Sequence, residues 1–236
     1  MRDRNSVIGV IDSGVNGTLL ERVYKGRGFR LDADGGVFRS GDFLDNLNHG
    51  TQIATAILSH LPEARLCVAK VFTEGLATSS QQIAAALQWL IEQNVDLINM
   101  SLGLTIDRES IREACEDARA RGVVLIASSP AHGQVVYPAA YNGVVSVTGD
   151  ARCTESQCSY LNSSQAEFGA SVRSRELTVV GSSVAAAHFT GIVASTAAEL
   201  NTNYENTLRQ LRQSADIQGG DQTPWLGPNA GAVKYR

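Results

Sequence analysis

Short apolar runs rich in Val, Ile and Leu alternate with segments of helical periodicity along most of the chain. The runs are Val7–Ile11, Leu66–Phe72, Val95–Met100, Val123–Ala127 and Val144–Thr148. Strands that are apolar at nearly every position are buried on both faces, which is typical of parallel strands covered by helices. The pattern therefore predicts an α/β fold of three layers, with a mostly parallel central sheet and helices on both of its faces.

The segments between the runs contain recognisable helix starts. Apolar residues recur at helical spacing after His49. Thr78 or Ser79 is predicted to cap a second helix, because each is followed three residues later by Gln. Asp107 and Asn203 are predicted to cap two further helices.

Two other regions complete the prediction of secondary structure. A long helix of small residues is expected over Val184–Leu200. Residues 15–48 are rich in Gly, Asp and Arg without sustained periodicity, so we expect long surface loops with one short strand.

Bulk composition narrows the classes of function. The 236 residues are 43% hydrophobic and 19% charged, which suits one globular α/β domain, and no linker or repeat divides residues 1–236. The formal charge of −4, without a basic stripe, argues against a nucleic-acid partner. No apolar run reaches the roughly 18 residues of a membrane span, and Met1–Asn5 leads straight into a strand rather than a signal core. We therefore expect a cytoplasmic protein with no signal peptide and no membrane association.

The cysteines and one acidic loop are the candidates for cross-links and metals. Four cysteines are too few for a disulfide framework, and Cys67 and Cys115 are predicted to be core residues. Cys153 and Cys158 could close a small loop, but without a signal peptide we expect free thiols. Asp32–Gly36 resembles half of a calcium loop but lacks the later oxygen ligands, so no metal and no cofactor are expected.

Three polar residues lie where such a sheet would gather reactive groups. Asp12 follows the first apolar run, His49 opens a helix, and Ser183 opens another. Taken singly, each of these residues could have an ordinary structural role in a turn, a helix start or a helix cap. Together they are the carboxylate, imidazole and hydroxyl that a nucleophilic triad requires, in a chain order known for this chemistry.

The chain resembles the subtilisin-like serine peptidases. The matching segments are Val10–Gly14 (VIDSG), His49–Thr51 (HGT), Asp96–Gly103 (DLINMSLG) and Gly181–His188 (GSSVAAAH). The resemblance extends over about Val7–Glu199 and implies the three-layer subtilisin-like fold. Residues 1–236 are then expected to form one peptidase domain without the folding pro-domain of secreted relatives.

The resemblance also implies roles for individual residues. Asp12 would orient the imidazole, His49 would act as general base and then acid, and Ser183 would be the acylated nucleophile. An extended peptide would pair with two strand edges, and side chains beside these edges would line pockets for the substrate. The substrate-binding residues implied in this way are Ser101, Leu102, Gly103, Gly75, Leu76, Ala77, Ile83, Ala127, Ser128 and Ser129. Among them, Leu102 and Ile83 would line an apolar pocket for the fourth residue before the scissile bond. No acidic residue is evident in the first pocket.

One departure from the family pattern concerns the oxyanion hole. Aligned without gaps, Ala131 occupies the position of the asparagine that donates to the oxyanion, and a methyl group cannot donate. Losing one such donor costs about 100- to 1000-fold in turnover. The backbone N–H of Ser183 would remain, and His132, Ser128, Ser129 or a bound water are candidates for the second donor. Gln52 and Ser182 replace a histidine and a threonine of the family, and we expect both changes to be minor.

The remaining histidines are assigned no catalytic part. His188 matches a structural position of the family, and His60 is predicted to be a surface or capping residue near a helix end.

The expected function is that of a slow serine endopeptidase. The chain is similar in size and layout to small subtilases that remove leader peptides from modified peptides and protein subunits, including those serving quinohemoprotein amine dehydrogenase maturation. A peptide or protein substrate, such as a precursor leader peptide, and a partner from a maturation complex are therefore expected. The alternative is a catalytically silent subtilase fold that binds peptides or acts as a scaffold. A nucleotide-binding domain is disfavoured, because Asp12–Gly17 has the spacing of neither phosphate loop.

Overall fold

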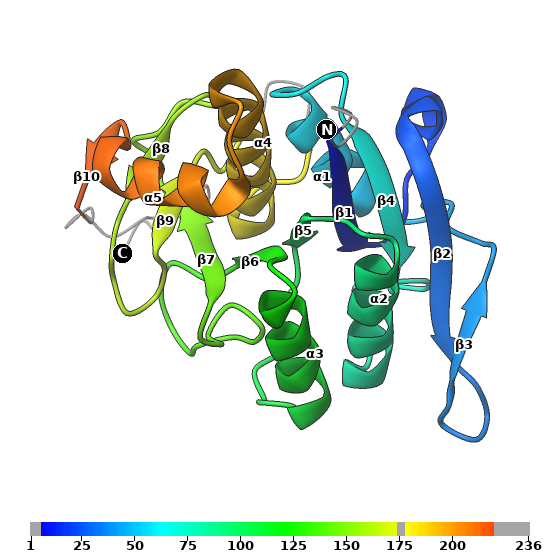
Figure 1. Ribbon diagram of the computed structural model, residues 1–236. Helices are drawn as coiled ribbons and strands as arrows, with labels where there is room; N and C mark the ends of the chain where they lie inside the picture. Colours follow the sequence, from blue (N-terminus) through cyan, green and yellow to red (C-terminus); the bar gives the residue numbers. More distant parts are fainter. Residues whose placement is uncertain (1–5, 174–177, 220–236) are drawn as a thin grey trace, which may run out of the picture.

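The computed structural model describes residues 6–173 and 178–219, in which ten strands form one sheet (Figure 1). Their order across the sheet is β10-β8-β9-β7-β6-β5-β1-β4-β2-β3. The strands are β1 (Val7–Asp12), β2 (Val23–Leu31), β3 (Val37–Ser40), β4 (Arg65–Lys70), β5 (Leu97–Met100), β6 (Val124–Ser128), β7 (Val144–Gly149), β8 (Cys158–Tyr160), β9 (Phe168–Ala170) and β10 (Ile217–Gln218). The pairs from β2 to β9 through the centre are parallel, and only β2 with β3 and β8 with β9 are antiparallel. The predicted mostly parallel sheet is confirmed.

Helices cover both faces of the sheet and divide the core in two. Helix α4 packs on one face together with α1, and α5 lies against α4, whereas α2 and α3 pack together on the other face (Figure 1). The helices are α1 (His49–Leu58), α2 (Ser80–Glu92), α3 (Glu109–Ala120), α4 (Ser182–Leu200) and α5 (Tyr204–Ser214), with a short 3-10 turn at Gly17–Arg22. The three-layer arrangement agrees with the prediction.

Strand β1 shows how the apolar runs build both halves of the core. It lies between β4 and β5, and successive side chains point to opposite faces. Ile8 and Val10 therefore join the cluster beneath α1 and α4, whereas Ile11 joins the cluster beneath α2 and α3. A strand that is buried on both faces cannot alternate apolar with polar residues, which explains why this run is apolar at nearly every position.

Two of the predicted helix caps are present. The Ser79 hydroxyl accepts from the Gln82 backbone N–H at 3.2 Å, and Gln82 returns a bond to the Ser79 N–H, so Ser79 rather than Thr78 completes a capping box. Asn203 Oδ1 accepts from the backbone N–H of Asn206 at 2.8 Å.

The prediction that Asp107 caps α3 is wrong. The N-cap is Arg108, and its side chain makes no capping hydrogen bond. The Asp107 carboxylate instead accepts the Tyr141 hydroxyl at 2.8 Å and pairs with Arg112. The Asp107 oxygen that the local pattern predicted as a helix cap therefore accepts a hydrogen bond from Tyr141, which lies far away in the chain.

The prediction of loops with one short strand over residues 15–48 is also incorrect, because two strands lie there. Two glycines interrupt the alternation of apolar and polar residues in β2, because the backbone there lies close to residues 42 and 43. A Cβ on Gly26 would lie 2.3 Å from the ring of Phe43, and one on Gly28 would lie 2.3 Å from the carbonyl oxygen of Asp42. These contacts require glycine, and glycine removes the apolar alternation by which a strand is recognised.

The structure shows the surroundings of the four cysteines and of the acidic loop between β2 and β3. All four cysteines are free and buried, Cys153 and Cys158 included. The Asp32 carboxylate accepts the backbone N–H groups of Asp34 and Gly36 at 3.0 and 2.7 Å, so it closes the turn between β2 and β3. Across the described residues, neither a metal-binding cluster of His, Cys, Asp and Glu nor a helix suited to crossing a bilayer is found.

Candidate active site

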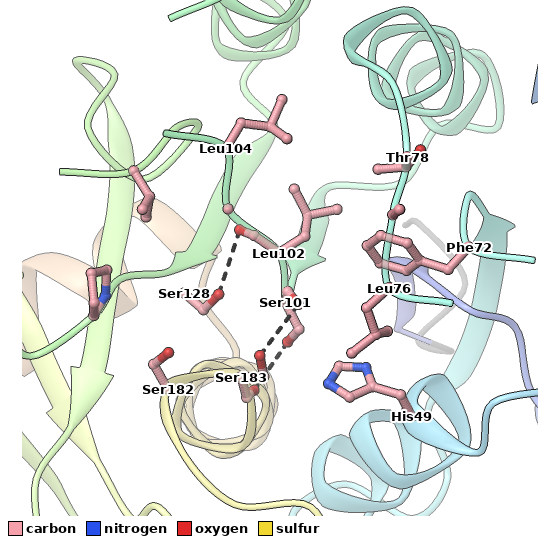
Figure 2. A pocket seen from close by; sticks show the side chains of 14 residues that line it. His49, Phe72, Leu76, Thr78, Ser101, Leu102, Leu104, Ser128, Ser182 and Ser183 are labelled. Atoms are coloured by element: carbon pink, nitrogen blue, oxygen red, sulfur yellow. Dashed lines mark hydrogen bonds between the residues drawn. The ribbon is translucent and has the colours of Figure 1, made fainter. Parts of the chain in front are cut away.

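A cavity of about 400 Å³ opens where β1 and β5 end and where α1 and α4 begin (Figure 2). This is the edge at which parallel sheets collect their functional side chains. The lining residues are His49, Phe72, Leu76, Ala77, Thr78, Ser101, Leu102, Gly103, Leu104, Ser128, Pro130, Val136, Ser182 and Ser183. Two of the three residues of the predicted triad thus line one cavity, and the third lies directly behind His49.

Asp12 and His49 form a buried pair. The Oδ1 atom of Asp12 lies 2.7 Å from Nδ1 of His49, and it also accepts the backbone N–H of Ser13 at 2.7 Å. Asp12 has no exposed surface, whereas the His49 ring borders the cavity. Because Nδ1 faces the carboxylate, Nε2 is the ring nitrogen left to exchange a proton with a bound substrate.

The surroundings of His49 raise its pKa. Burial by itself lowers the pKa of the imidazole, but the hydrogen bond to Asp12 and the charges of Asp12 and Asp45 act in the opposite direction and prevail. The result is a base with a pKa above its ordinary value, which suits an imidazole that must take up a proton during a reaction.

A second buried carboxylate, Asp45, holds the start of α1 and was missed by the sequence analysis. Its side chain is 4% exposed, and its pKa is lowered because hydrogen bonds outweigh the cost of burial. The donors to its two oxygens are the Ser13 hydroxyl, the backbone N–H groups of Leu47, Asn48 and Thr51, and the Thr51 hydroxyl. Asp45 thereby ties the turn after β1 to the first residues of α1 and sets where His49 stands.

The sequence contained only a weak indication of this role. Asp45 lies four residues before His49 in a polar stretch. Acidic residues are also common in such stretches when they only form ordinary turns. The decisive bond is the one from Ser13, whose hydroxyl also accepts the Gly50 N–H at 2.8 Å. That link joins residues more than thirty positions apart, so no local pattern reveals it.

We expect Asp45→Asn to shift the pH dependence of any reaction that uses neutral His49. Removing the negative charge of Asp45 lowers the pKa of His49, so the acidic limb of the pH–rate profile moves to lower pH in the variant. The wild-type limb is expected above pH 6.5, the ordinary value for histidine. The check is kcat/KM measured from pH 5 to 9, with Asp42→Asn as an exposed control. A limb that stays in place would contradict the assigned influence of Asp45.

Ser183 lies in the first turn of α4. Its hydroxyl donates to the carbonyl oxygen of Ser101 at 3.3 Å, and Ser101 Oγ lies 3.0 Å from the Ser183 carbonyl oxygen (Figure 2). No hydrogen bond joins Ser183 to His49 in this arrangement of the described residues, because the Ser183 hydroxyl donates to Ser101 instead. Triad hydrogen bonds are often open without substrate.

Gln52 connects α1 to the segment that leads into α4. Its Oε1 accepts the backbone N–H groups of Thr178 and Val179 at 2.7 and 2.8 Å. Gln52, at the position of the family histidine, therefore links the helix of His49 to the approach to Ser183.

Only some of the predicted substrate-binding residues line the cavity. Those that line the cavity are Ser101, Leu102, Gly103, Leu76, Ala77 and Ser128. Gly75 does not, and Ile83 and Ala127 have no exposed surface because they belong to the core beneath α2 and α3. Ser129 is 3% exposed, and its hydroxyl donates to the Gln165 carbonyl at 2.6 Å. Burial away from the cavity explains the corrections at Ile83, Ala127 and Ser129.

Val136 borders the cavity and was missed by the sequence analysis. It packs against Gly103, where an added Cβ would lie 3.0 Å from Val136 Cβ. Together with Phe72, Leu102 and Leu104 it gives the cavity apolar walls, and the described lining residues include no Asp, Glu, Lys or Arg.

On the far side of Ser183 from His49, a second cavity of about 350 Å³ adjoins the first. Ala131 and His132 line it, and Pro130 and Ser182 border both cavities. His132 is exposed and makes no hydrogen bond with the described residues. The backbone N–H groups of Ser182 and Ser183, at the start of α4, have no acceptor among the described residues, so they can bind a negative oxygen.

Two solved structures have a fold similar to that of this chain. A structure entitled "S41 Psychrophilic Protease" has a TM-score of 0.68 and 22% sequence identity, covering 92% of this chain and 85% of its own. One entitled "Crystal Structure of a Lanthipeptide Protease" has a TM-score of 0.69 and 20% identity, covering 91% and 81%. Both likenesses concern the fold alone.

The family follows from the sequence. The model of the subtilase family matches residues 3–223, so the chain belongs to that family. The thermostable alkaline protease of Halalkalibacterium halodurans is 26% identical over 232 residues, covering 90% of this chain and 62% of the relative. The major intracellular serine protease of Bacillus subtilis is 29% identical over 167 residues, covering 62% and 51%. The chain thus spans between half and two thirds of the length of these two relatives.

Proposed function

We propose that the chain is a serine endopeptidase that uses Asp12, His49 and Ser183 as a catalytic triad. The observation that carries this proposal is the buried Asp12–His49 pair, with its 2.7 Å contact, which presents the other ring nitrogen to the cavity lined by Ser183. Membership of the subtilase family supports it.

In the acylation step, the Ser183 hydroxyl turns from the Ser101 carbonyl to His49 Nε2. Its oxygen attacks the peptide carbonyl carbon while the proton passes to Nε2. Asp12 stabilises the imidazolium that forms, because its carboxylate already holds the Nδ1–H. When the C–N bond breaks, His49 gives the proton to the leaving amine and an acyl ester remains on Ser183.

In the deacylation step, a water molecule takes the place of the leaving amine. His49 removes one of its protons as the water oxygen attacks the ester carbon, and it returns the proton to Ser183 Oγ as the ester bond breaks. Negative charge develops on the carbonyl oxygen in both steps, and the Ser183 backbone N–H at the start of α4 faces it.

The walls of the cavity favour apolar substrate residues. Phe72, Leu76, Leu102, Leu104 and Val136 contribute apolar surface. A basic side chain would find no carboxylate among the lining residues, so the cost of removing its charge from water would not be offset.

We further infer a dedicated processing role in the cytoplasm, on a peptide or protein precursor with a leader segment. The fold likeness to a lanthipeptide protease and the similarity to intracellular serine proteases support this role. Free, buried cysteines also suit a reducing compartment. The test is to identify a precursor encoded next to this chain and incubate the two. Cleavage at one bond, with unrelated casein left intact, is expected, and general degradation of casein would contradict a dedicated role.

Covalent labelling tests the proposed catalysis. A fluorophosphonate is expected to add one phosphonyl group to the wild-type protein, seen by intact-mass spectrometry and mapped to Ser183 by peptide analysis. The Ser183→Ala variant is expected to stay unlabelled, whereas Ser195→Ala, which removes another serine from α4, should label normally. Absence of labelling in the folded wild-type chain would contradict a serine-peptidase function.

A catalytically silent, peptide-binding fold is the second candidate. Ala131 at the position of the expected asparagine favours it, as does the orientation of the Ser183 hydroxyl toward Ser101. It predicts that apolar peptides bind in the cavity without cleavage or labelling. Binding of such a peptide at micromolar concentration to an unlabelled wild-type protein would favour this candidate over the peptidase.

A further inference from the structure

The loop from Pro130 to Val135 borders the site but is held by very few interactions of its own. Its first residue lines both cavities, and the next two residues line the second cavity. Within the part of the chain that the structure describes, the loop takes part in a single hydrogen bond, in which the Gly133 carbonyl accepts Nε2 of Gln165 at 3.0 Å. The position of the Pro130–Val135 loop therefore depends on one side chain from a distant part of the sequence.

The backbone fixes the chain on either side of this loop. Before the loop, the Ser129 N–H donates to the Val147 carbonyl at 2.8 Å, beside the pairing of β6 with β7. After the loop, Leu104 and Tyr137 exchange two backbone hydrogen bonds of 2.8 Å. Between these points Gly133 has a φ of 102°, a conformation that glycine adopts without steric cost. The loop itself thus has little that selects one conformation, so an external contact must do so.

Gln165 reaches the loop from the turn between β8 and β9, which is firmly attached to the sheet. The Leu161 N–H donates to the Glu167 carbonyl at 2.9 Å and closes this turn, and the Glu167 N–H donates to the Ser146 carbonyl of β7 at 3.0 Å. A second bond runs the other way, from the Ser129 hydroxyl to the Gln165 carbonyl at 2.6 Å. Gln165 therefore joins the end of β6 to the middle of the loop.

The contact with Gly133 requires the amide group of Gln165. A backbone carbonyl can only accept, so the group that faces it must be a donor. The other atom of the amide, Oε1, is enclosed and has no partner among the described residues. Turning the amide over would place two acceptors against each other, and an ionised carboxylate or an alkyl group here would lose the hydrogen bond.

We propose that Gln165 is a positioning residue of the peptidase site. It holds the Pro130–Val135 loop in place, and this loop forms the wall of the site on the opposite side of Ser183 from His49. Gln165 lines neither cavity, so it acts on the reaction only through Gly133. The inference rests on the proposed peptidase function, because the place of the loop affects catalysis only if Ser183 reacts.

The first experiment tests the contact without using catalysis. It is made in the Ser183→Ala protein with thermolysin, which cuts before apolar residues and can reach the bond before Val135. Adding Gln165→Ala is expected to speed this cut by about tenfold, because the loop then leaves its place more often. Gln157→Ala is the matched control, since that amide binds only Thr154 in a separate turn. Mass spectrometry identifies the cut, and equal rates with and without Gln165→Ala overturn the proposal.

The second experiment measures what the contact contributes to the reaction. In the otherwise wild-type protein, Gln165→Ala is expected to lower the rate of fluorophosphonate labelling and the kcat for an apolar tetrapeptide p-nitroanilide by about tenfold. KM should change less than about threefold, because a displaced wall disturbs the transition state more than substrate binding. Gln157→Ala should match wild type. Unchanged labelling and kcat in Gln165→Ala, despite faster thermolysin cleavage, overturn the positioning role.

A pH profile separates the lost donor from lost packing. Gln165→Glu keeps the size of the side chain, but its carboxyl group can donate to the Gly133 carbonyl only when it is protonated. The labelling rate of Gln165→Glu relative to wild type is therefore expected to rise about fivefold from pH 8 to pH 5, whereas the ratio for Gln165→Ala stays constant. A constant ratio for Gln165→Glu overturns the role of the donor. A wild-type chain that is never labelled overturns the peptidase function itself, whereas normal labelling of Gln165→Ala overturns only the role of Gln165.

Discussion

Asp12→Asn is expected to lower kcat by about 10,000-fold while leaving the fold intact. The carboxylate accepts hydrogen bonds from His49 Nδ1 and from the Ser13 backbone, each at 2.7 Å. An asparagine amide can turn its NH₂ group toward the ring, which places the imidazole proton on Nε2, where the base must be free. It also removes the negative charge that stabilises the imidazolium.

The measurement is steady-state hydrolysis of an apolar peptide anilide between pH 6 and 9, with fluorophosphonate labelling as a second readout. Asp107→Asn is the matched control, because that carboxylate accepts the Tyr141 hydroxyl and does not line the cavity. Both variants should unfold at denaturant concentrations close to wild type. Less than a tenfold loss of kcat in Asp12→Asn would show that His49 does not depend on this carboxylate.

His60→Gln is expected to make the folded protein less sensitive to acid. The prediction that His60 is a surface or capping residue is wrong, because its Nε2 lies 3.0 Å from Nδ1 of His188, with the rings nearly perpendicular. His188 has no exposed surface, and its Nε2 lies 3.2 Å from the Arg173 carbonyl. The carbonyl accepts the Nε2–H, so His188 Nδ1 accepts from His60, and the pair is neutral.

The sign of the pH effect follows from the lowered pKa. Burial and the charge of His188 lower the pKa of His60 to about 4, against a nearby Glu155 that acts in the opposite direction. Burial also lowers the pKa of His188. Between pH 6.5 and 4, His60 is therefore protonated in the unfolded chain but largely neutral in the folded chain. Folding stability falls over this window by about 3 kcal/mol on account of His60.

Urea unfolding at pH 7, 5.5 and 4 measures this loss. Glutamine keeps an N–H donor for His188 but does not titrate, so the decline in unfolding free energy from pH 7 to 4 should shrink by about 3 kcal/mol. His132→Gln, at an exposed position, should leave the decline unchanged. An equal decline in His60→Gln and wild type would refute the assigned penalty.

The contrast between His49 and His60 shows why a histidine cannot be assigned from its neighbours in sequence. Both lie in or next to α1, separated by about three turns. His49 faces a buried carboxylate, which raises its pKa, whereas burial first of all, and then the neighbouring His188, lower the pKa of His60. The partner is contributed by β1 in one case and by α4 in the other. Only the packing of α1 onto both elements decides between them.

The oxyanion side of the site shows the same limit. The sequence indicated that Ala131 leaves a donor missing and proposed His132, Ser128 and Ser129 as replacements, because they are close in the chain. The structure shows that this side of the site is also bordered by a residue some fifty positions later in the chain, because Ser182 of α4 lines both cavities together with Pro130. A sheet edge and a helix start meet there, and that meeting is set by the whole core.

The sequence alone determined the features that depend on local chemistry. Apolar runs that must be buried on both faces predicted the parallel sheet, and the ordered residues Asp12, His49 and Ser183 identified the family motifs. The tertiary structure decided which groups support them: the Asp45 carboxylate beneath α1, the Gln52 link to Val179, and the burial of Ile83 under the cavity. The physical reason is that these interactions join segments far apart in the chain, and a hydrogen bond or a buried contact depends on positions in space that local sequence patterns do not encode.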